Sequence, residues 1–132
     1  MEYQNLVDNA LKIRKSAYVP YSKFSVGASL LTKSGKIFNG CNIENVSYPL
    51  GMCAERVAMF KAISEKEFDF SAICVIGGLE ENPTDFCYPC GGCIQVMNEF
   101  CNKDFKIILF NGTDIKIYTL AELSPYGFKE LK

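Results

Sequence analysis

Apolar residues recur at helical spacing in three stretches of the chain. The first stretch predicts an amphipathic helix over Tyr3–Tyr18, which Pro20 terminates. The second stretch predicts a helix from Cys53 to about Ser64, and the third predicts a helix that begins at Cys93. The helix from Cys53 is apolar on most sides, so we expect it to be covered by more than its own domain.

Other apolar patterns predict three strands before the third helix. Phe24–Leu30 alternates between apolar and small or polar residues, and Lys36–Ile43 returns after a turn at Lys33–Gly35. This pattern predicts a half-buried hairpin. Ala72–Gly78 is a continuous apolar run, which is typical of a central strand buried on both faces.

The last part of the chain predicts a second hairpin. Lys106–Phe110 and Ile115–Tyr118 flank the turn dipeptide Asn111-Gly112, and a short helix is expected near Thr119. The third helix connects two buried strands, so these strands should run parallel. The predicted fold class is α/β, a three-layer arrangement in which a mixed five-stranded sheet carries helices on both faces. We expect one domain over residues 1–132.

Composition and charge exclude several partners. The 132 residues are 48% hydrophobic and 22% charged, which is typical of an ordinary globular domain. A net charge of −1 creates no field that gathers a polyanion, so nucleic acid is not an expected partner. No signal peptide is visible, and the longest apolar run, around Ser71–Leu79, is too short to span a bilayer. We therefore expect a cytoplasmic protein without a membrane partner.

Cysteine usage indicates a metal site. The seven cysteines are an odd number without signs of secretion, so metal ligands explain them better than disulfides do. Cys90-x2-Cys93 lies at a predicted loop–helix junction, and Cys53 begins another predicted helix. Backbone N–H groups at helix starts favour thiolates. Three thiolates on Zn²⁺ leave a fourth position for water, so one catalytic zinc ion per chain is expected.

Two charged residues follow the first of these ligands. Glu55 could take a proton from water at the metal, although acids are also common in the first turn of any helix. Cys-x-Glu followed by Pro-Cys-x2-Cys is the arrangement of zinc deaminases, so we assign Glu55 as the catalytic acid and base. Arg56 either offsets the negative charge of a three-thiolate zinc centre or forms a surface ion pair.

The remaining cysteines have other interpretations. Cys87 lies three residues before Cys90, as in part of an iron–sulfur motif, but the Cys-Pro that should follow is missing. Cys87 could instead close the zinc site as a fourth ligand and make it structural. Cys41, Cys74 and Cys101 lie at core positions of predicted strands or helices, where apolar packing is expected.

The chain resembles the small homotetrameric cytidine deaminases over nearly its whole length. The matching segments are Tyr21–Ala28, Gly40–Asn45, Cys53–Arg56, Pro89–Val96 and Pro125–Phe128. The resemblance implies the cytidine deaminase fold and hydrolysis of cytidine and deoxycytidine to the uridines. It also implies a tetramer whose active sites borrow residues from neighbouring subunits.

The resemblance further implies substrate contacts. Asn42 and Glu44 are expected at the ribose hydroxyls, with a strand-end turn as the alternative role for Asn42. Phe24 is expected near the pyrimidine or, alternatively, in the core. The backbone N–H of Ala54 is expected at the base carbonyl. Tyr48 and Phe128 are expected to reach the site from another chain, with packing of the tail as the alternative.

Two departures from the family pattern stand out. Ile94 replaces the usual Arg after the last ligand, and the Glu80–Tyr88 loop is longer than usual and ends in Cys87-Tyr88.

Two rival functions are considered: a deaminase of another cytosine nucleoside such as blasticidin S, and a non-enzymatic metal protein. A polynucleotide-editing deaminase is disfavoured because the chain has no basic stripe.

Overall fold

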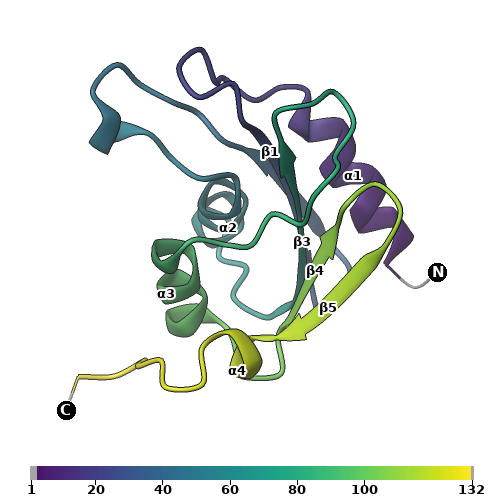
Figure 1. The fold of residues 1–132 in the computed structure, drawn as a ribbon. Helices are drawn as coiled ribbons and strands as arrows, with labels where there is room; N and C mark the ends of the chain where they lie inside the picture. Colours follow the sequence, from purple (N-terminus) through teal and green to yellow (C-terminus); the bar gives the residue numbers. More distant parts are fainter. Residues whose placement is uncertain (1–2, 132) are drawn as a thin grey trace.

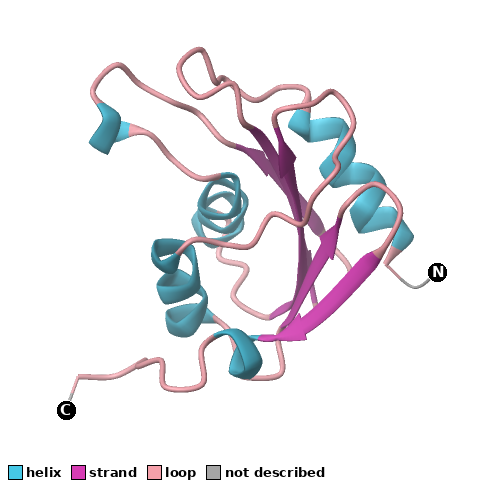
Figure 2. Cartoon of the chain, in the orientation of Figure 1, coloured by secondary structure: helices cyan, strands magenta, loops and turns pink. Residues whose placement is uncertain are grey.

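The computed structural model describes residues 3–131 and contains a five-stranded sheet in the order β2-β1-β3-β4-β5 (Figure 1). Helices pack against this sheet, and long loops join the elements at one end (Figure 2). In chain order the elements are α1 Gln4–Arg14, β1 Ser25–Thr32, β2 Ile37–Cys41, the short 3₁₀ helix η1 Tyr48–Leu50, α2 Ala54–Ser64, β3 Phe70–Gly78, α3 Gly91–Phe100, β4 Lys106–Phe110, β5 Ile115–Thr119 and α4 Leu120–Leu123.

The sheet is mixed, as its pattern predicted. Strand β3 runs parallel to β4, and the other neighbouring strands pair antiparallel. Helix α1 covers one face, whereas α2 and α3 cover the other (Figure 1). Each face has its own cluster of buried apolar side chains, the smaller one beneath α1. The predicted α/β class, with a five-stranded sheet and helices on both faces, is therefore confirmed.

The expectation of a half-buried first strand is wrong. Residues 26–30 of β1 are all buried, because β1 lies between β2 and β3 and helices cover both of its faces. Gly27 lets α1 approach closely, since a Cβ atom there would run into the backbone of Ala10 and Arg14. Small residues at alternate positions thus mark close packing of a helix, not exposure to solvent.

The end of the first helix also differs from the prediction, whereas the second hairpin lies where it was predicted. Helix α1 ends at Arg14, four residues before the predicted end at Tyr18, and Tyr18 forms a bridge with Ile43 instead. Strands β4 and β5 lie where the sequence predicted them and are joined by residues 111–114, which contain the predicted turn dipeptide Asn111-Gly112. The Asn111 side chain accepts hydrogen bonds from the N–H groups of Thr113 and Asp114, which stabilises this turn.

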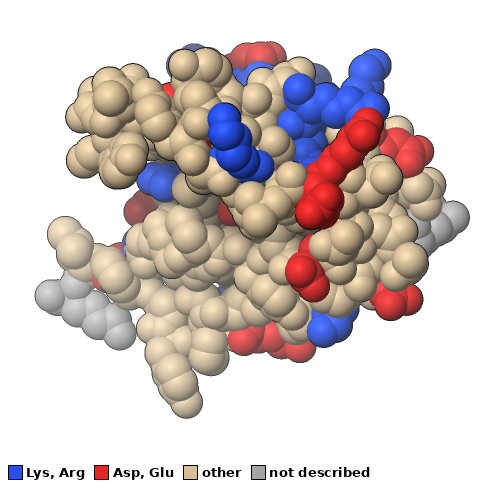
Figure 3. Space-filling model, turned by 45° about the horizontal axis from the view of Figure 1, so that its top comes forward, with Lys and Arg blue, Asp and Glu red and all other residues tan. Residues whose placement is uncertain are grey.

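One face of the molecule carries charges of both signs. On the face shown in Figure 3, basic and acidic side chains lie beside one another, and most of the surface is uncharged. This mixture agrees with the net charge of −1. Among the described residues, no helix is long and apolar enough to cross a membrane.

Candidate metal and catalytic site

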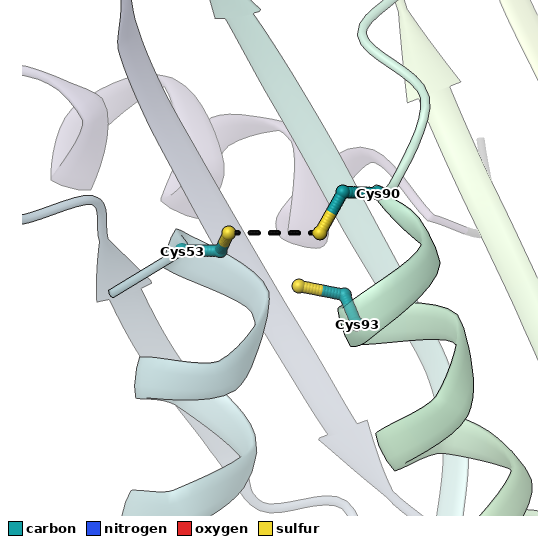
Figure 4. Close-up of side chains that lie close together, drawn as sticks. All are labelled: Cys53, Cys90 and Cys93. Carbon is teal, nitrogen blue, oxygen red and sulfur yellow. Dashed lines mark hydrogen bonds between the residues drawn. The ribbon is translucent and has the colours of Figure 1, made fainter. Parts of the chain in front are cut away.

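Three thiols from two helix starts converge at one point (Figure 4). Cys53 is the N-cap of α2, Cys90 is the N-cap of α3, and Cys93 lies in the first turn of α3. Their sulfur atoms all lie within 4.8 Å of one another, and the Cys53 and Cys90 sulfurs are 3.7 Å apart. One ion can therefore contact all three sulfurs.

Packing of α2 on the sheet sets the position of Cys53. Gly40 of β2 faces this helix, and a Cβ atom there would lie 2.5 Å from both the Ala54 carbonyl oxygen and the Ala58 nitrogen. Only glycine allows the backbones to approach this closely. The start of α2, including its N-cap Cys53, is thus held against the strand.

The electrostatics of the cluster suit a divalent ion with soft ligands. Interaction with the Cys93 thiol, together with Arg56, lowers the pKa of Cys53 to about 5. The same interaction and burial raise the pKa of Cys93. Free N–H groups at the two helix starts add positive potential. Three sulfur donors within reach of one ion match the preferences of Zn²⁺.

Glu55 is buried directly beside the cluster. Its side chain is only 4% exposed, and burial raises its pKa from 4.5 to about 7, with the Cys53 thiolate contributing in the same direction. An ordinary acid in a first helical turn would be solvated and ionised. A buried carboxyl that gains and loses a proton near neutral pH suits general acid–base chemistry.

The guanidinium of Arg56 faces the thiols. Its Nη2 atom donates to the Cys53 sulfur at 3.3 Å, and this contact raises the pKa of Arg56. The one salt bridge found among residues 3–131 joins Lys36 to Glu67, so Arg56 has no carboxylate partner there. This geometry favours the charge-balancing interpretation over a surface ion pair.

Cys87 lies outside the group of three. Its sulfur packs close to Gly77, where an added Cβ atom would lie 2.9 Å from it, and burial raises the pKa of Cys87 to about 11. Within the described part of the chain, the only cluster able to hold a metal comprises Cys53, Cys90 and Cys93. The geometry thus disfavours a site closed by four thiolates.

A cavity of about 410 Å³ reaches the cluster of thiols at Cys53. Its lining includes three of the predicted substrate residues, Asn42, Glu44 and Tyr48, together with Cys53 and Arg56. Asn42 and Glu44 lie just beyond the end of β2, and both line this cavity. The space is large enough for a small polar molecule.

Asn42 and Glu44 also hold the backbone around β1. The Asn42 carboxamide accepts from Val26 N–H at 2.9 Å and donates to the Phe24 carbonyl at 2.8 Å. Glu44 Oε1 accepts from the N–H groups of Tyr21 and Ser22, both at 3.1 Å. Each side chain retains hydrogen-bonding capacity, since an amide and a carboxylate can each make further bonds.

The other predicted substrate residues are more dispersed. Ala54 is buried at the first position of α2, and Phe24 lines a separate cavity beside Gly77. Tyr48, 76% exposed, lies on the projecting 42–53 segment, and Phe128, 60% exposed, lies on the tail. Phe128 does not line the cavity beside the thiols.

Sequence reasoning missed Arg14 and the contacts of the Glu80–Tyr88 loop. Arg14 is buried, and its guanidinium donates only to backbone carbonyls. Its position gave a signal, because it falls on the apolar face of α1 with Val7 and Ala10. The Tyr88 and Tyr118 hydroxyls lie 3.0 Å apart, which ties the loop to β5.

Comparison with known proteins places the chain in a family. The family model described as "Cytidine and deoxycytidylate deaminase zinc-binding region" matches residues 1–109. The cytidine deaminase of Halalkalibacterium halodurans is 48% identical over 97% of this chain and 95% of its own length. That of Sporosarcina psychrophila is 45% identical over 98% and 93%, respectively.

A solved structure has the same fold. The crystal structure of cytidine deaminase from Burkholderia pseudomallei matches with a TM-score of 0.87 and 40% identity, covering 97% of this chain and all of the other. The family model and the structural match both span the segments that supply the three thiols and Glu55. The chain therefore belongs to the cytidine and deoxycytidylate deaminase family.

Proposed function

We propose that this protein is a zinc-dependent enzyme that hydrolyses cytidine and deoxycytidine to uridine and deoxyuridine, releasing ammonia. The observation that carries the proposal is the group of three thiols within reach of one ion, beside a buried carboxyl group. Relatives of the chain carry the name cytidine deaminase. The proposed role is in pyrimidine salvage.

The residues have distinct roles in this mechanism. Cys53, Cys90 and Cys93 hold the zinc ion, which supplies Lewis acidity that makes water nucleophilic near neutral pH. Glu55 accepts a proton from the water that attacks C4 of the cytosine ring and donates a proton to ring atom N3. Glu55 then carries the second proton of that water to the departing amine, so that ammonia leaves. Arg56 offsets the thiolate charge.

Substrate binding uses the cavity beside the thiols. Asn42 and Glu44 hydrogen-bond the ribose hydroxyls with the capacity that their backbone contacts leave. The Ala54 N–H, which lies in the first turn of α2 and lacks an intrahelical acceptor, binds the base carbonyl. Phe24 packs near the pyrimidine.

The proposed assembly is a homotetramer with shared active sites. Support comes from the exposed apolar side chains of the 42–53 segment, Val46, Tyr48 and Leu50, and from Phe128 on the tail. Such side chains mark protein–protein contacts when they cluster. In this proposal Tyr48 and Phe128 complete a neighbouring subunit's site. Residues 1–132 form one domain, and the cysteine usage suits the cytoplasm.

The test is an assay on the purified protein. Zinc is counted per chain, and the ultraviolet absorbance is followed after adding cytidine, deoxycytidine or blasticidin S. We expect about one zinc per chain and conversion of both cytidine and deoxycytidine to their uridine products. Faster turnover of blasticidin S would favour the rival deaminase, and bound zinc without any turnover would favour a structural metal protein.

Glu55→Gln is the decisive variant for the mechanism. It should keep its zinc and lose at least about 10²-fold in turnover, because the amide cannot carry a proton. Near-normal turnover in a zinc-loaded variant would remove Glu55 from its proposed role.

A further inference from the structure

Arg14, the last residue of α1, is a buried cation bonded to three separate backbone segments. Its side chain is only 5% exposed. Nε donates to the Ser25 carbonyl at 2.9 Å, and Nη2 donates to the Gly78 carbonyl at 2.9 Å. Nη1 donates to the Glu81 carbonyl at 2.8 Å, and Nη2 donates also to that of Glu80 at 2.5 Å. One side chain thus joins the start of β1 to the end of β3 and to the loop that follows.

The position of Arg14 depends on the packing of α1 on β1. Because Gly27 has no side chain, the backbone of α1 lies directly against the strand there. This contact places the guanidinium at the end of the sheet where β1 begins and β3 ends. Burial lowers the pKa of Arg14, yet an arginine stays charged throughout the physiological range. A buried guanidinium without its acceptors would be strongly unfavourable, so the contacts persist.

The segments that Arg14 holds lead directly to the metal and substrate residues. Ser25 follows Phe24, whose carbonyl accepts from Asn42. The loop that begins at Leu79 ends at Cys90, the N-cap of α3 and one of the three clustered thiols. Within this loop the Cys87 sulfur packs beside Gly77, close to the Phe24 ring.

The far end of the loop is attached to β5 by other contacts. The Phe86 ring lies 4.6 Å from the Lys116 ammonium, and the Tyr88 hydroxyl lies 3.0 Å from that of Tyr118. Arg14 supplies the attachment at the near end, where the loop leaves β3. Loss of Arg14 would free the first loop residues while the β5 contacts remain.

We propose that Arg14 is a positioning residue of the metal and substrate site, which acts by fixing the course of the loop from Leu79 to Cys90 and the start of β1. The inference rests on the proposed function for its kinetic consequences, but its consequence for metal retention does not. Arg14→Gln keeps a polar side chain but loses the branched guanidinium, whose nitrogens donate to three segments. Arg14→Lys keeps the charge and only one donor nitrogen.

The test compares both variants with Val7→Ala. Val7 is buried on the same helix, so this substitution also destabilises the fold, but it leaves the loop contacts intact. Each zinc-loaded protein is mixed with a chromogenic chelator, and the rate of zinc release is measured together with thermal unfolding, kcat and KM on cytidine. Hydrogen exchange of the 79–89 amides reports on the loop itself.

Arg14→Gln should release zinc at least about tenfold faster than the wild type, the low end for residues that support metal ligands from outside. It should also raise KM more than it lowers kcat and increase exchange in residues 79–89, whereas Arg14→Lys should give intermediate values. Val7→Ala should lose thermal stability without these changes. If Arg14→Gln does not fold, Arg14→Lys carries the same comparison.

Zinc release and loop exchange that change only in proportion to thermal stability, equally in the Arg14 and Val7 variants, would overturn the proposal. A wild-type protein that binds zinc but leaves cytidine unchanged would overturn the proposed function instead, while the zinc-release comparison would still test Arg14.

Discussion

At the scale of single residues, the cysteines of this chain differ mainly in their surroundings. Cys53, Cys90 and Cys93 share one point at two helix starts, while burial raises the pKa of Cys74, Cys87 and Cys101. The spacing of Cys90 and Cys93 revealed their pairing, but the position of Cys87 outside the cluster depends on its packing beside Gly77. Motif spacing alone therefore could not decide between three ligands and four.

This difference predicts opposite results for two matched substitutions. Cys93→Ser removes one of three clustered sulfurs, so the purified variant should retain well below one zinc per chain. Cys87→Ser changes a thiol outside the cluster and should retain about one zinc. Metal analysis after dialysis against a weak chelator distinguishes them, and zinc loss from the Cys87 variant would indicate a fourth ligand.

Burial of Glu55 predicts a pH dependence of stability in the zinc-free protein. The folded-state pKa of Glu55 is raised from 4.5 to about 7, so the folded state binds more protons than the unfolded state between these values. The free energy of unfolding should therefore fall as pH rises from 4.5 to 7 because of this group. Glu55→Gln lacks this contribution.

Urea unfolding of both proteins at several pH values measures the effect. The lowered pKa of Cys53 acts in the opposite direction, stabilising the folded state as pH rises above about 5, but it is present in both proteins. The wild-type free energy should fall relative to that of the variant across this window. Parallel curves would mean that Glu55 is not buried as described.

At the scale of elements, α2 depends on its contact with β2. A Cβ atom on Gly40 would lie 2.5 Å from two backbone atoms of α2, and neither atom can move without moving the helix. Gly40→Ala should therefore lower the free energy of unfolding by about 1–3 kcal/mol, the typical cost of overpacking a core. Gly91→Ala is the control, because nothing lies within 4 Å of its added Cβ atom. Equal stability of the two variants in urea would contradict the close packing.

The elements themselves were largely predictable, and the misses share a physical cause. Helices α2 and α3 begin within two residues of their predicted starts, because their motifs mark loop–helix junctions. The end of α1 was missed because Tyr18 is drawn into pairing with the chain after β2, donating to the Asn42 carbonyl and accepting from Glu44 N–H. That pairing joins segments distant in sequence, which periodicity cannot detect.

The candidate site likewise contains residues that the sequence predicts and contacts that it does not. Its thiols and Glu55 follow from local motifs, whereas the backbone contacts of Asn42 and the clamp formed by Arg14 depend on tertiary packing. Arg14 lies on an apolar helix face, where a charge signals a buried partner. The identity of that partner could not be predicted, because four carbonyl groups from distant segments have no sequence signature.

At the scale of the whole molecule, the exposed tail and projecting segment predict complementation between inactive variants. Glu55→Gln lacks the proposed acid–base group, and Phe128→Ala lacks the proposed contribution to a neighbour's site. Each should be weakly active alone, whereas the proposed tetramers, refolded from an equal mixture, should contain some complete sites and regain activity. Light scattering checks that both variants assemble.

The control for this experiment is a mixture in which both defects lie in the same site. Glu55→Gln mixed with Cys93→Ser should recover nothing, because both substitutions affect groups that one chain supplies to a single site. Absence of recovery in the Phe128 mixture as well would place Phe128 in its own chain's site or outside any site.

Two of the sulfurs that meet at the cluster belong to residues 37 positions apart, Cys53 and Cys90. An ion held between them is a reversible cross-link that closes a loop containing α2 and β3. By the chain-entropy relation used for covalent cross-links, closing a loop of this size lowers the conformational entropy of the unfolded chain. The corresponding free energy is on the order of 4 kcal/mol. The ion that equips the protein for chemistry thus also restricts the conformations through which the chain must search as it folds.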